Sequence, residues 1–200
     1  MNSGGAGFDL LMAPLERMTL HPLRERLIRE ASGRVLEVGA GTGVNMRHYD
    51  PAVVTSLDLT DQDLYFGYIL RRRREHGPFP FPVYLSDADV RDLPFEDASF
   101  DTVVFTLLFC SVEDPSAGLA EIRRVLRPHG RAIFIEHVLP PRKPLSRAFR
   151  RLTPAWRRVA SNCHLDRSTV PAIRAAGFDV TVVGSLAYGI FVGGIATLAL

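Results

Sequence analysis

The chain has 200 residues, and 46% of them are hydrophobic, which is enough to bury the core of one domain. Its formal net charge of +2 does not favour a dedicated nucleic-acid binder, so no nucleic-acid partner is expected. Two cysteines, Cys110 and Cys163, are too few for a disulfide framework and indicate a reducing compartment, which predicts a cytoplasmic protein. Residues 1–9 lack the pattern of a signal peptide. We predict no metal site, and the sequence leaves the oligomeric state open.

A single domain is predicted over residues 1–200, and it begins with an N-terminal helical cap over 1–33. Helical character extends over Phe8–Ala31. Pro22 suits a position in the first turn of a helix, and Gly33 suits the residue that stops it.

Glycines on alternate positions follow the first predicted strand. Arg34–Val38 indicates a buried parallel strand, Gly39–Gly43 the turn after it, and a helix is expected from Val44 to about Tyr49. A strand, a glycine turn and a helix form the opening unit of a Rossmann-like nucleotide-binding sheet. The spacing excludes a phosphate loop, which ends in Gly-Lys-Ser/Thr, and a dinucleotide fingerprint, which needs a glycine where Val44 stands. A purely structural turn in another α/β protein is the alternative.

Asp58 is expected at the end of the second strand, Val53–Leu57, and it lies 19 residues after Gly39. A carboxylate at this place accepts hydrogen bonds from a ribose diol in Rossmann-like sheets, so Asp58 is predicted to bind a ribose. Capping of the next helix is the alternative, and Asp61 suits that role better. The next helix, Asp61–Glu75, ends in four arginines, which we interpret as a solvated helix end rather than a phosphate or membrane contact.

Three further strands are predicted at Val83–Leu85, Phe100–Thr106 and Arg131–Glu136. An amphipathic helix, Pro115–Leu126, connects the last two of them. The fourth strand should end beside the glycine turn, at the edge where open α/β sheets bind ligands. The fifth strand brings Glu136 and His137 to the same edge.

Residues 140–168 are predicted to form a helical insertion near this ligand-binding edge. The part over Pro140–Ala160 carries an apolar stripe on one helical face, and Pro154 is expected to split it, with Thr153 as the N-cap of the second half. Between residues 142 and 158 there are seven basic residues and no acid. Such a segment either makes a peripheral contact with an anionic membrane or packs its stripe on the core, and the sequence leaves both open.

The last part of the chain is predicted to be a helix and a hairpin. The helix Ser168–Ala176, closed by Gly177, precedes strands at about Val180–Val183 and Ile190–Leu198. Thr181–Leu200 has no charged residue, so a membrane anchor is the alternative, but its four glycines favour strands. The expected fold is α/β, a Rossmann-like doubly wound sheet of seven strands in the order 3-2-1-4-5-7-6, with the last strand antiparallel.

The pattern Glu37-x-Gly39-x-Gly41-x-Gly43 resembles motif I of the class I S-adenosylmethionine-dependent methyltransferases. The stretch Asp89-Val90-Arg91-Asp92-Leu93-Pro94-Phe95, followed by Ser99-Phe100-Asp101, resembles their ubiquinone-biosynthesis-like branch. The resemblance implies that Asp89 contacts the adenine amine, that the Val90 amide contacts a ring nitrogen, and that the methionine part lies after the fourth strand. The cofactor-binding residues implied in this way are Glu37, Gly39, Ala40, Gly41, Gly43, Asp58, Leu59, Asp89, Val90, Thr106 and Leu107.

Shorter stretches resemble one branch in particular, the methyltransferase-like seven thiol S-methyltransferases. They include Cys110-Ser111-Val112, Glu136-His137-Val138 and Asn162-Cys163-His164-Leu165. This resemblance implies an enzyme that methylates a small lipophilic acceptor, foremost a thiol, and releases S-adenosylhomocysteine. His137 and His164 are the candidate bases, with Glu136 as an orienting residue, and a purely structural role is the alternative. Other interpretations are methylation of a phospholipid amine or a quinone precursor and, in a different class, a non-catalytic module that binds S-adenosylmethionine.

Overall fold

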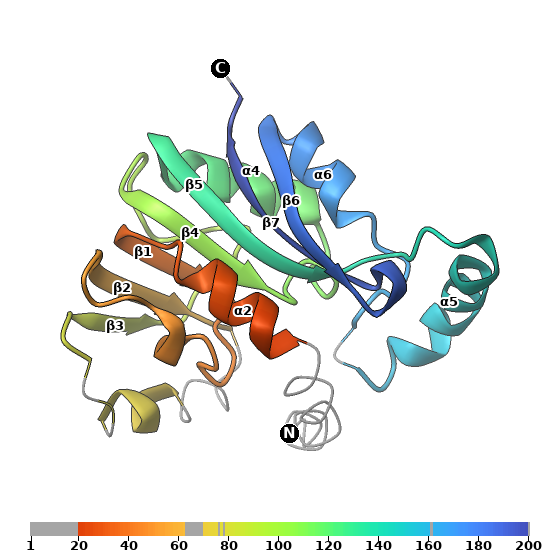
Figure 1. Cartoon of the computed structure of the whole chain (residues 1–200), viewed down its shortest axis with the longest axis horizontal. Coiled ribbons are helices and arrows are strands. Elements are labelled where there is room, and N and C mark those ends of the chain that lie inside the picture. The colour runs from red at the N-terminus through yellow and green to blue at the C-terminus, as the bar shows by residue number, and fades with distance from the viewer. Residues whose placement is uncertain (1–19, 63–69, 76, 78, 161, 200) are drawn as a thin grey trace.

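A computed structural model describes residues 20–62, 70–75, 77, 79–160 and 162–199. Within them lies a seven-stranded sheet with the order β3-β2-β1-β4-β5-β7-β6 (Figure 1). The first five strands pair in parallel, while β7 is antiparallel to both β5 and β6. The predicted strand order and the antiparallel last strand are therefore confirmed. The part of the expected N-terminal cap that precedes residue 20 lies outside the described residues.

The strands are β1 (Gly33–Val38), β2 (Val54–Thr60), β3 (Val83–Ser86), β4 (Phe100–Thr106), β5 (Leu126–His137), β6 (Phe178–Leu186) and β7 (Phe191–Leu198). Their central members are apolar runs buried on both faces, as a parallel sheet covered by helices requires. The second strand is longer than predicted and continues to Thr60, where it still pairs with β3. Asp58 therefore lies inside β2 and not at its end.

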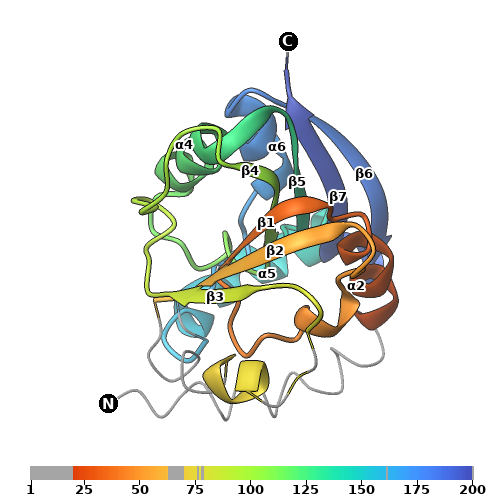
Figure 2. The same cartoon turned by 90° about the vertical axis from the view of Figure 1, so that its left-hand side faces the viewer.

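The helices are α2 (His21–Ile28), η2 (Met46–His48), α4 (Pro115–Val125), α5 (Lys143–Trp156), α6 (Thr169–Ala175) and η3 (Ala187–Gly189). Helix α2 covers one face of the sheet, and α4 and α6 cover the other (Figure 2). Leu20 and Leu27 pack with Val104 and Ile135 on the first face. Their neighbours Val103 and Phe134 lie on the opposite face, with α4 and α6, because successive side chains of a strand point to opposite faces.

Two expectations about helix ends are wrong. Helix α2 ends at Ile28 rather than near Gly33, because Ser32 already exchanges two hydrogen bonds with the Thr102 hydroxyl on β4, at 3.2 and 2.9 Å. Gly33 is instead the first residue of β1, with a φ of +70°. After the glycine turn only the short η2 forms in place of a helix from Val44 to Tyr49. Its flanking side chains turn inward to a buried acid, which is described below.

The expected break at Pro154 is also wrong, because α5 is continuous across this residue. Pro154 has no N–H to donate, and the hydroxyl of Thr153 bonds the carbonyl oxygen of Phe149 at 2.8 Å beside it. The helix of residues 169–175 and both terminal strands are confirmed, and β6 is longer than predicted. Of the expected helix Asp61–Glu75, residues 70–75 are helical, and residues 63–69 lie outside the description. None of the described helices is long and apolar enough to cross a membrane.

Candidate cofactor-binding and active site

The glycine turn presents bare main chain at the carboxyl edge of the sheet. Gly39, Gly41 and Gly43 have φ values of +67°, +55° and +73°, which side chains with a Cβ rarely adopt. A Cβ at Gly39 would lie 2.7 Å from the Leu108 side chain, and one at Gly43 would lie 2.7 Å from that of Leu70. A Cβ at Gly41 would meet no atom of the described residues within 4 Å. The turn therefore leaves room for a ligand at Gly41.

A buried hydrogen-bond network supports this turn from below. Glu37 accepts from the Asn45 amide at 2.8 Å through one carboxylate oxygen and from the Tyr49 hydroxyl at 2.7 Å through the other. Arg24, which is only 2% exposed, donates from Nη1 to Asn45 at 2.7 Å and to the Thr106 hydroxyl at 3.1 Å. The network joins α2, the glycine turn and the end of β4, so the inward turn of Asn45 and Tyr49 replaces a regular helix.

Glu37 is consequently an internal anchor of the turn. Burial raises its pKa to about 7, although the bonds from Tyr49 and Asn45 and the charge of Arg24 act in the opposite direction. Sequence analysis did not identify Arg24, Asn45 or Tyr49. One signal was present, because Arg24 stands beside Leu23 and one turn before Ile28 in the buried face of α2. A contact between Glu37 and the cofactor stays a prediction.

The carboxylate of Asp61 contacts the turn directly. Its Oδ2 accepts from the Gly41 amide at 2.7 Å. Asp58 instead lies against the sheet, with its Oδ2 3.3 Å from Nε of Arg34, whose guanidinium also lies over the Phe100 ring. The expected ribose contact of Asp58 stays a prediction, and so does a main-chain contact of Leu59, whose side chain is buried in the core.

The loop with Asp89 lies near the same part of the edge. Asp89 accepts from Gln62, which directly follows Asp61, and more strongly from the Arg91 side chain and amide. These contacts lower the pKa of Asp89 to about 2, the Arg91 hydrogen bonds being the largest cause. Asp89 is therefore ionised at neutral pH and can accept hydrogen bonds from a bound amine. The Val90 side chain is buried in the core, so only its main chain is available.

The loop after β4 is held by a second buried acid. Leu107 has a φ of +54° and donates its amide to Ile135 at 2.7 Å. Glu136 accepts from the amides of Leu108 at 2.9 Å and Phe109 at 3.2 Å through Oε1. Its other oxygen has no partner among the described residues, and burial raises the pKa of Glu136 to about 8. Glu136 therefore holds the loop after β4. It does not orient His137, because adjacent residues of a strand point to opposite faces.

Glu136→Gln is expected to flatten the dependence of stability on pH. Between an unfolded pKa near 4.5 and the folded value of about 8, the folded protein binds one more proton through Glu136. The free energy of unfolding therefore falls as pH rises through this range, by up to ~1.4 kcal/mol per pH unit for one proton. Urea unfolding at pH values of about 5.5, 6.5 and 7.5 would show a shallower decline in the variant. Glu113→Gln, whose side chain is 85% exposed, should leave the decline unchanged. Parallel curves for Glu136→Gln and the wild type would contradict this account.

The two candidate histidines have different surroundings. His137 is buried, stacks on Phe149 with ring centroids 5.9 Å apart, and contacts Phe191 edge-on. Burial lowers its pKa to about 4. The amide of His164 donates to the carbonyl oxygen of Cys110 at 2.7 Å, which places it beside the loop after β4. Burial, followed by the charges of Arg167 and Arg157, lowers the pKa of His164 as well. Both imidazoles are therefore neutral near pH 7 and able to accept a proton.

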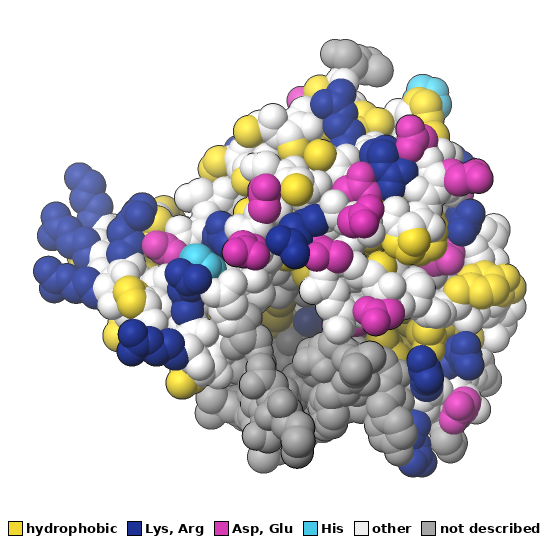
Figure 3. Space-filling model, turned by 180° about the vertical axis from the view of Figure 1, so that it is seen from behind, with side chains coloured by type: hydrophobic (Ala, Val, Ile, Leu, Met, Phe, Trp, Pro, Cys, Tyr) yellow, Lys and Arg dark blue, Asp and Glu magenta, His cyan; other side chains and the backbone are white. Residues whose placement is uncertain are grey.

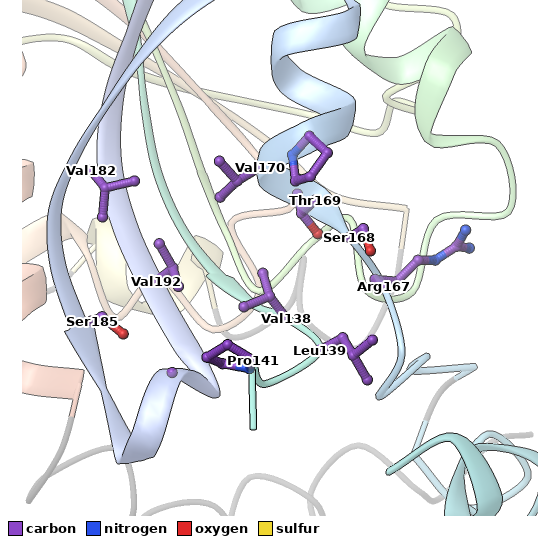
Figure 4. Close-up of a pocket in the computed structure, with 12 residues that line it drawn as sticks. Val138, Leu139, Pro141, Arg167, Ser168, Thr169, Val170, Val182, Ser185 and Val192 are labelled. Atoms are coloured by element: carbon purple, nitrogen blue, oxygen red, sulfur yellow. The ribbon is translucent and has the colours of Figure 1, made fainter. Parts of the chain in front are cut away.

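A separate cavity of about 380 Å³ lies between the start of α6 and the β6–β7 hairpin (Figure 4). Aliphatic side chains dominate its walls, among them Val138, Leu139, Val170, Val182 and Val192. Thr169 also lines it, with a buried hydroxyl that has no hydrogen-bond partner in the described part of the chain. None of the residues predicted as site residues lines this cavity.

The sheet is a nucleotide-binding sheet of the class I methyltransferase type. Its strand order reverses between β1 and β4, and the glycine turn lies at this point with carboxylates beside it. Residues 36–134 match the model of the methyltransferase domain family. Human thiol S-methyltransferase TMT1A is 31% identical over 170 residues, which cover 84% of this chain and 69% of the relative. Phosphatidylethanolamine N-methyltransferase of Cereibacter sphaeroides is 34% identical over 120 residues, 60% of this chain and 58% of the relative.

A solved structure of an S-adenosylmethionine-dependent methyltransferase from Thermotoga maritima shares the fold, with a TM-score of 0.68 and 20% identity over 96% of this chain and 95% of that one. The chain belongs to the S-adenosylmethionine-dependent methyltransferases, and its cofactor is S-adenosylmethionine. It spans 59% and 62% of the length of rat and human thiol S-methyltransferase TMT1B, respectively.

The residues at the edge fit this cofactor. Gly41 leaves open space at a main chain of positive φ, where a nucleoside can lie against the backbone. Asp61 and Asp89 provide carboxylates on the β2 and β3 side, for hydroxyls and for an amine. The loop that begins at Leu107 follows the end of β4, beside which the methionine part is expected, and its bonds to Ile135 and Glu136 hold it in place.

Proposed function

We propose that this protein transfers the methyl group of S-adenosylmethionine to a small lipophilic thiol and that S-adenosylhomocysteine is released. The observation that carries the thiol is the setting of His164. This neutral imidazole lies beside the loop after β4, and Arg157 and Arg167 lie close enough to lower its pKa. A neutral base can take the proton of a thiol, and the positive field favours the thiolate that remains. The thiol S-methyltransferase relatives support the same acceptor class.

When bound, the cofactor supplies an electrophilic methyl group on a sulfonium, so the protein mainly positions the acceptor and excludes water. The Arg24–Asn45–Glu37 network holds the glycine turn, and Glu136 holds the loop on the other side. The thiol proton would pass to the imidazole of His164. The thiolate would form the new bond to the methyl carbon as the bond from this carbon to the sulfonium sulfur breaks, and neutral S-adenosylhomocysteine would leave. His137 is enclosed by Phe149 and Phe191, so we give it a packing role.

A quinone precursor is the second candidate acceptor, because its ring hydroxyl also becomes an anion that Arg157 and Arg167 would stabilise. A phospholipid amine is less favoured by this argument, since its nucleophilic form is neutral and offers no anion for the two cations to stabilise. The relative from Cereibacter sphaeroides keeps this acceptor in the panel of the experiment. A non-catalytic module that only binds the cofactor is the alternative from another class.

The test is transfer of labelled methyl groups to a panel of lipophilic thiols, quinols and amines. Product on thiols is expected, and His164→Gln should lower kcat/KM at least ~10-fold near pH 7. The loss should shrink near pH 9, where the thiol ionises without a base, while the affinity for S-adenosylhomocysteine stays unchanged. His129→Gln, at an exposed position of β5, is the matched control and should have no effect.

Product on quinols or amines alone would overturn the thiol assignment. An equal loss for His164→Gln at both pH values would indicate a structural role of this residue. Binding of S-adenosylhomocysteine without product on any acceptor would favour the non-catalytic module.

A further inference from the structure

Helix α5 and the turn after it carry a large net positive charge. Between residues 142 and 158 the basic residues are Arg142, Lys143, Arg147, Arg150, Arg151, Arg157 and Arg158, and the segment contains no acid. The helix projects sideways from the sheet (Figure 1). Seen from behind, basic side chains fan out from this part of the molecule at the left edge (Figure 3).

One side of α5 is anchored to the body of the protein. Phe149 stacks on His137, Thr153 is buried, and Trp156 packs against a small cluster around Cys110 and Cys163. These inward positions fix which face of the helix points away from the sheet. The outward positions include Arg147, Arg150 and Arg151, which are exposed. Only part of the predicted apolar stripe therefore packs on the core, namely Phe149 and Trp156.

Large apolar side chains are exposed on α5, in the turn after it and on η3. Leu152 is 56% exposed and Val159 is 72% exposed. Tyr188 of η3 is 74% exposed, and the guanidinium of Arg142 lies 5.2 Å from the centroid of its ring. Exposed aliphatic and aromatic side chains beside cations are the composition of helices that lie in the headgroup region of membranes.

We propose that the outward face of α5, together with Leu152, Val159 and Tyr188, docks on an anionic membrane surface. The cations would contact lipid phosphates, and the apolar side chains would enter the boundary between headgroups and acyl chains. A nucleic acid is a poorer fit, because its backbone offers no partner for Leu152 and Val159.

The experiment is co-sedimentation of the full chain with vesicles of phosphatidylcholine alone and of phosphatidylcholine with roughly one third phosphatidylglycerol. Binding to the anionic vesicles only is expected. Arg147→Gln/Arg151→Gln should weaken this binding by about 10-fold or more, since two cations leave the contact. Arg71→Gln/Arg74→Gln removes the same charge from another exposed basic run and should bind like the wild type. Leu152→Ser should also weaken binding, without a change in net charge.

Absence of binding to anionic vesicles would overturn the proposal, and so would equal losses in the two arginine variants. Tighter binding to a short DNA duplex than to the vesicles, unaffected by Leu152→Ser, would indicate a general polyanion surface instead. Unchanged affinity of each variant for S-adenosylhomocysteine shows that the fold is intact. The experiment contains no methyl acceptor, so its result is independent of the proposed thiol substrate.

Discussion

Arg24→Met is expected to lower the free energy of unfolding by about 3 kcal/mol, because it leaves a buried polar network without its cation. Asn45 and Thr106 would each lose a hydrogen-bond donor, at 2.7 and 3.1 Å, and Glu37 would lose a favourable charge. Since these residues support the glycine turn and the end of β4, we also expect at least ~10-fold weaker binding of S-adenosylhomocysteine. Urea unfolding and titration calorimetry measure the two effects.

Arg29→Met is the matched control, because it makes the same change just beyond the end of α2. Arg29 is exposed and forms a surface ion pair with Glu25 at 3.1 Å. Such a pair contributes about 0–1 kcal/mol, so stability and affinity should change little. Similar losses in both variants would show that the network does not support the turn. A stability loss in Arg24→Met with unchanged affinity would confine the network to a structural role.

Gly41→Ala is expected to separate binding from folding. The φ of +55° makes alanine cost about 1–2 kcal/mol, but the new Cβ meets no described atom within 4 Å. The methyl group would instead occupy the space assigned to the cofactor, so binding of S-adenosylhomocysteine should weaken at least ~10-fold while the protein remains folded. Calorimetry on the folded variant measures this loss.

Gly177→Ala is the control for backbone strain. Gly177 has a φ of +88° after α6, and the atoms nearest to a Cβ there belong to the flexible guanidinium end of Arg123. The stability cost should be similar to that of Gly41→Ala, and the affinity should remain that of the wild type. If Gly41→Ala binds as tightly as the wild type, the cofactor does not lie against this part of the turn.

The elements of the sheet were predictable because their signals are local. The apolar runs that form β1 and β4 predict buried strands, and the glycines after Val38 predict a turn with positive φ. Helix ends were less predictable. The end of α2 depends on Thr102, which lies 70 residues from Ser32, and no local pattern reports that contact.

The partners of the site residues could not be predicted in the same way. Arg24 meets Thr106 across 82 residues, and Glu136 meets Leu108 across 28 residues. A buried arginine becomes understandable only once its acceptors are known, because its charge would otherwise favour solvent. Likewise, the spacing of His137 and His164 does not reveal which of them lies beside the loop after β4.

By itself, the sequence determined the order of the strands and the position of the glycine turn, and it predicted a set of acids and histidines for one edge of the sheet. Only the tertiary structure decided which of them meet. Because β2 continues to Thr60, Asp58 points onto a face of the sheet, and Asp61 reaches the Gly41 amide instead. Strand length and register set which side chain points where, and both result from pairing with distant strands rather than from neighbouring residues.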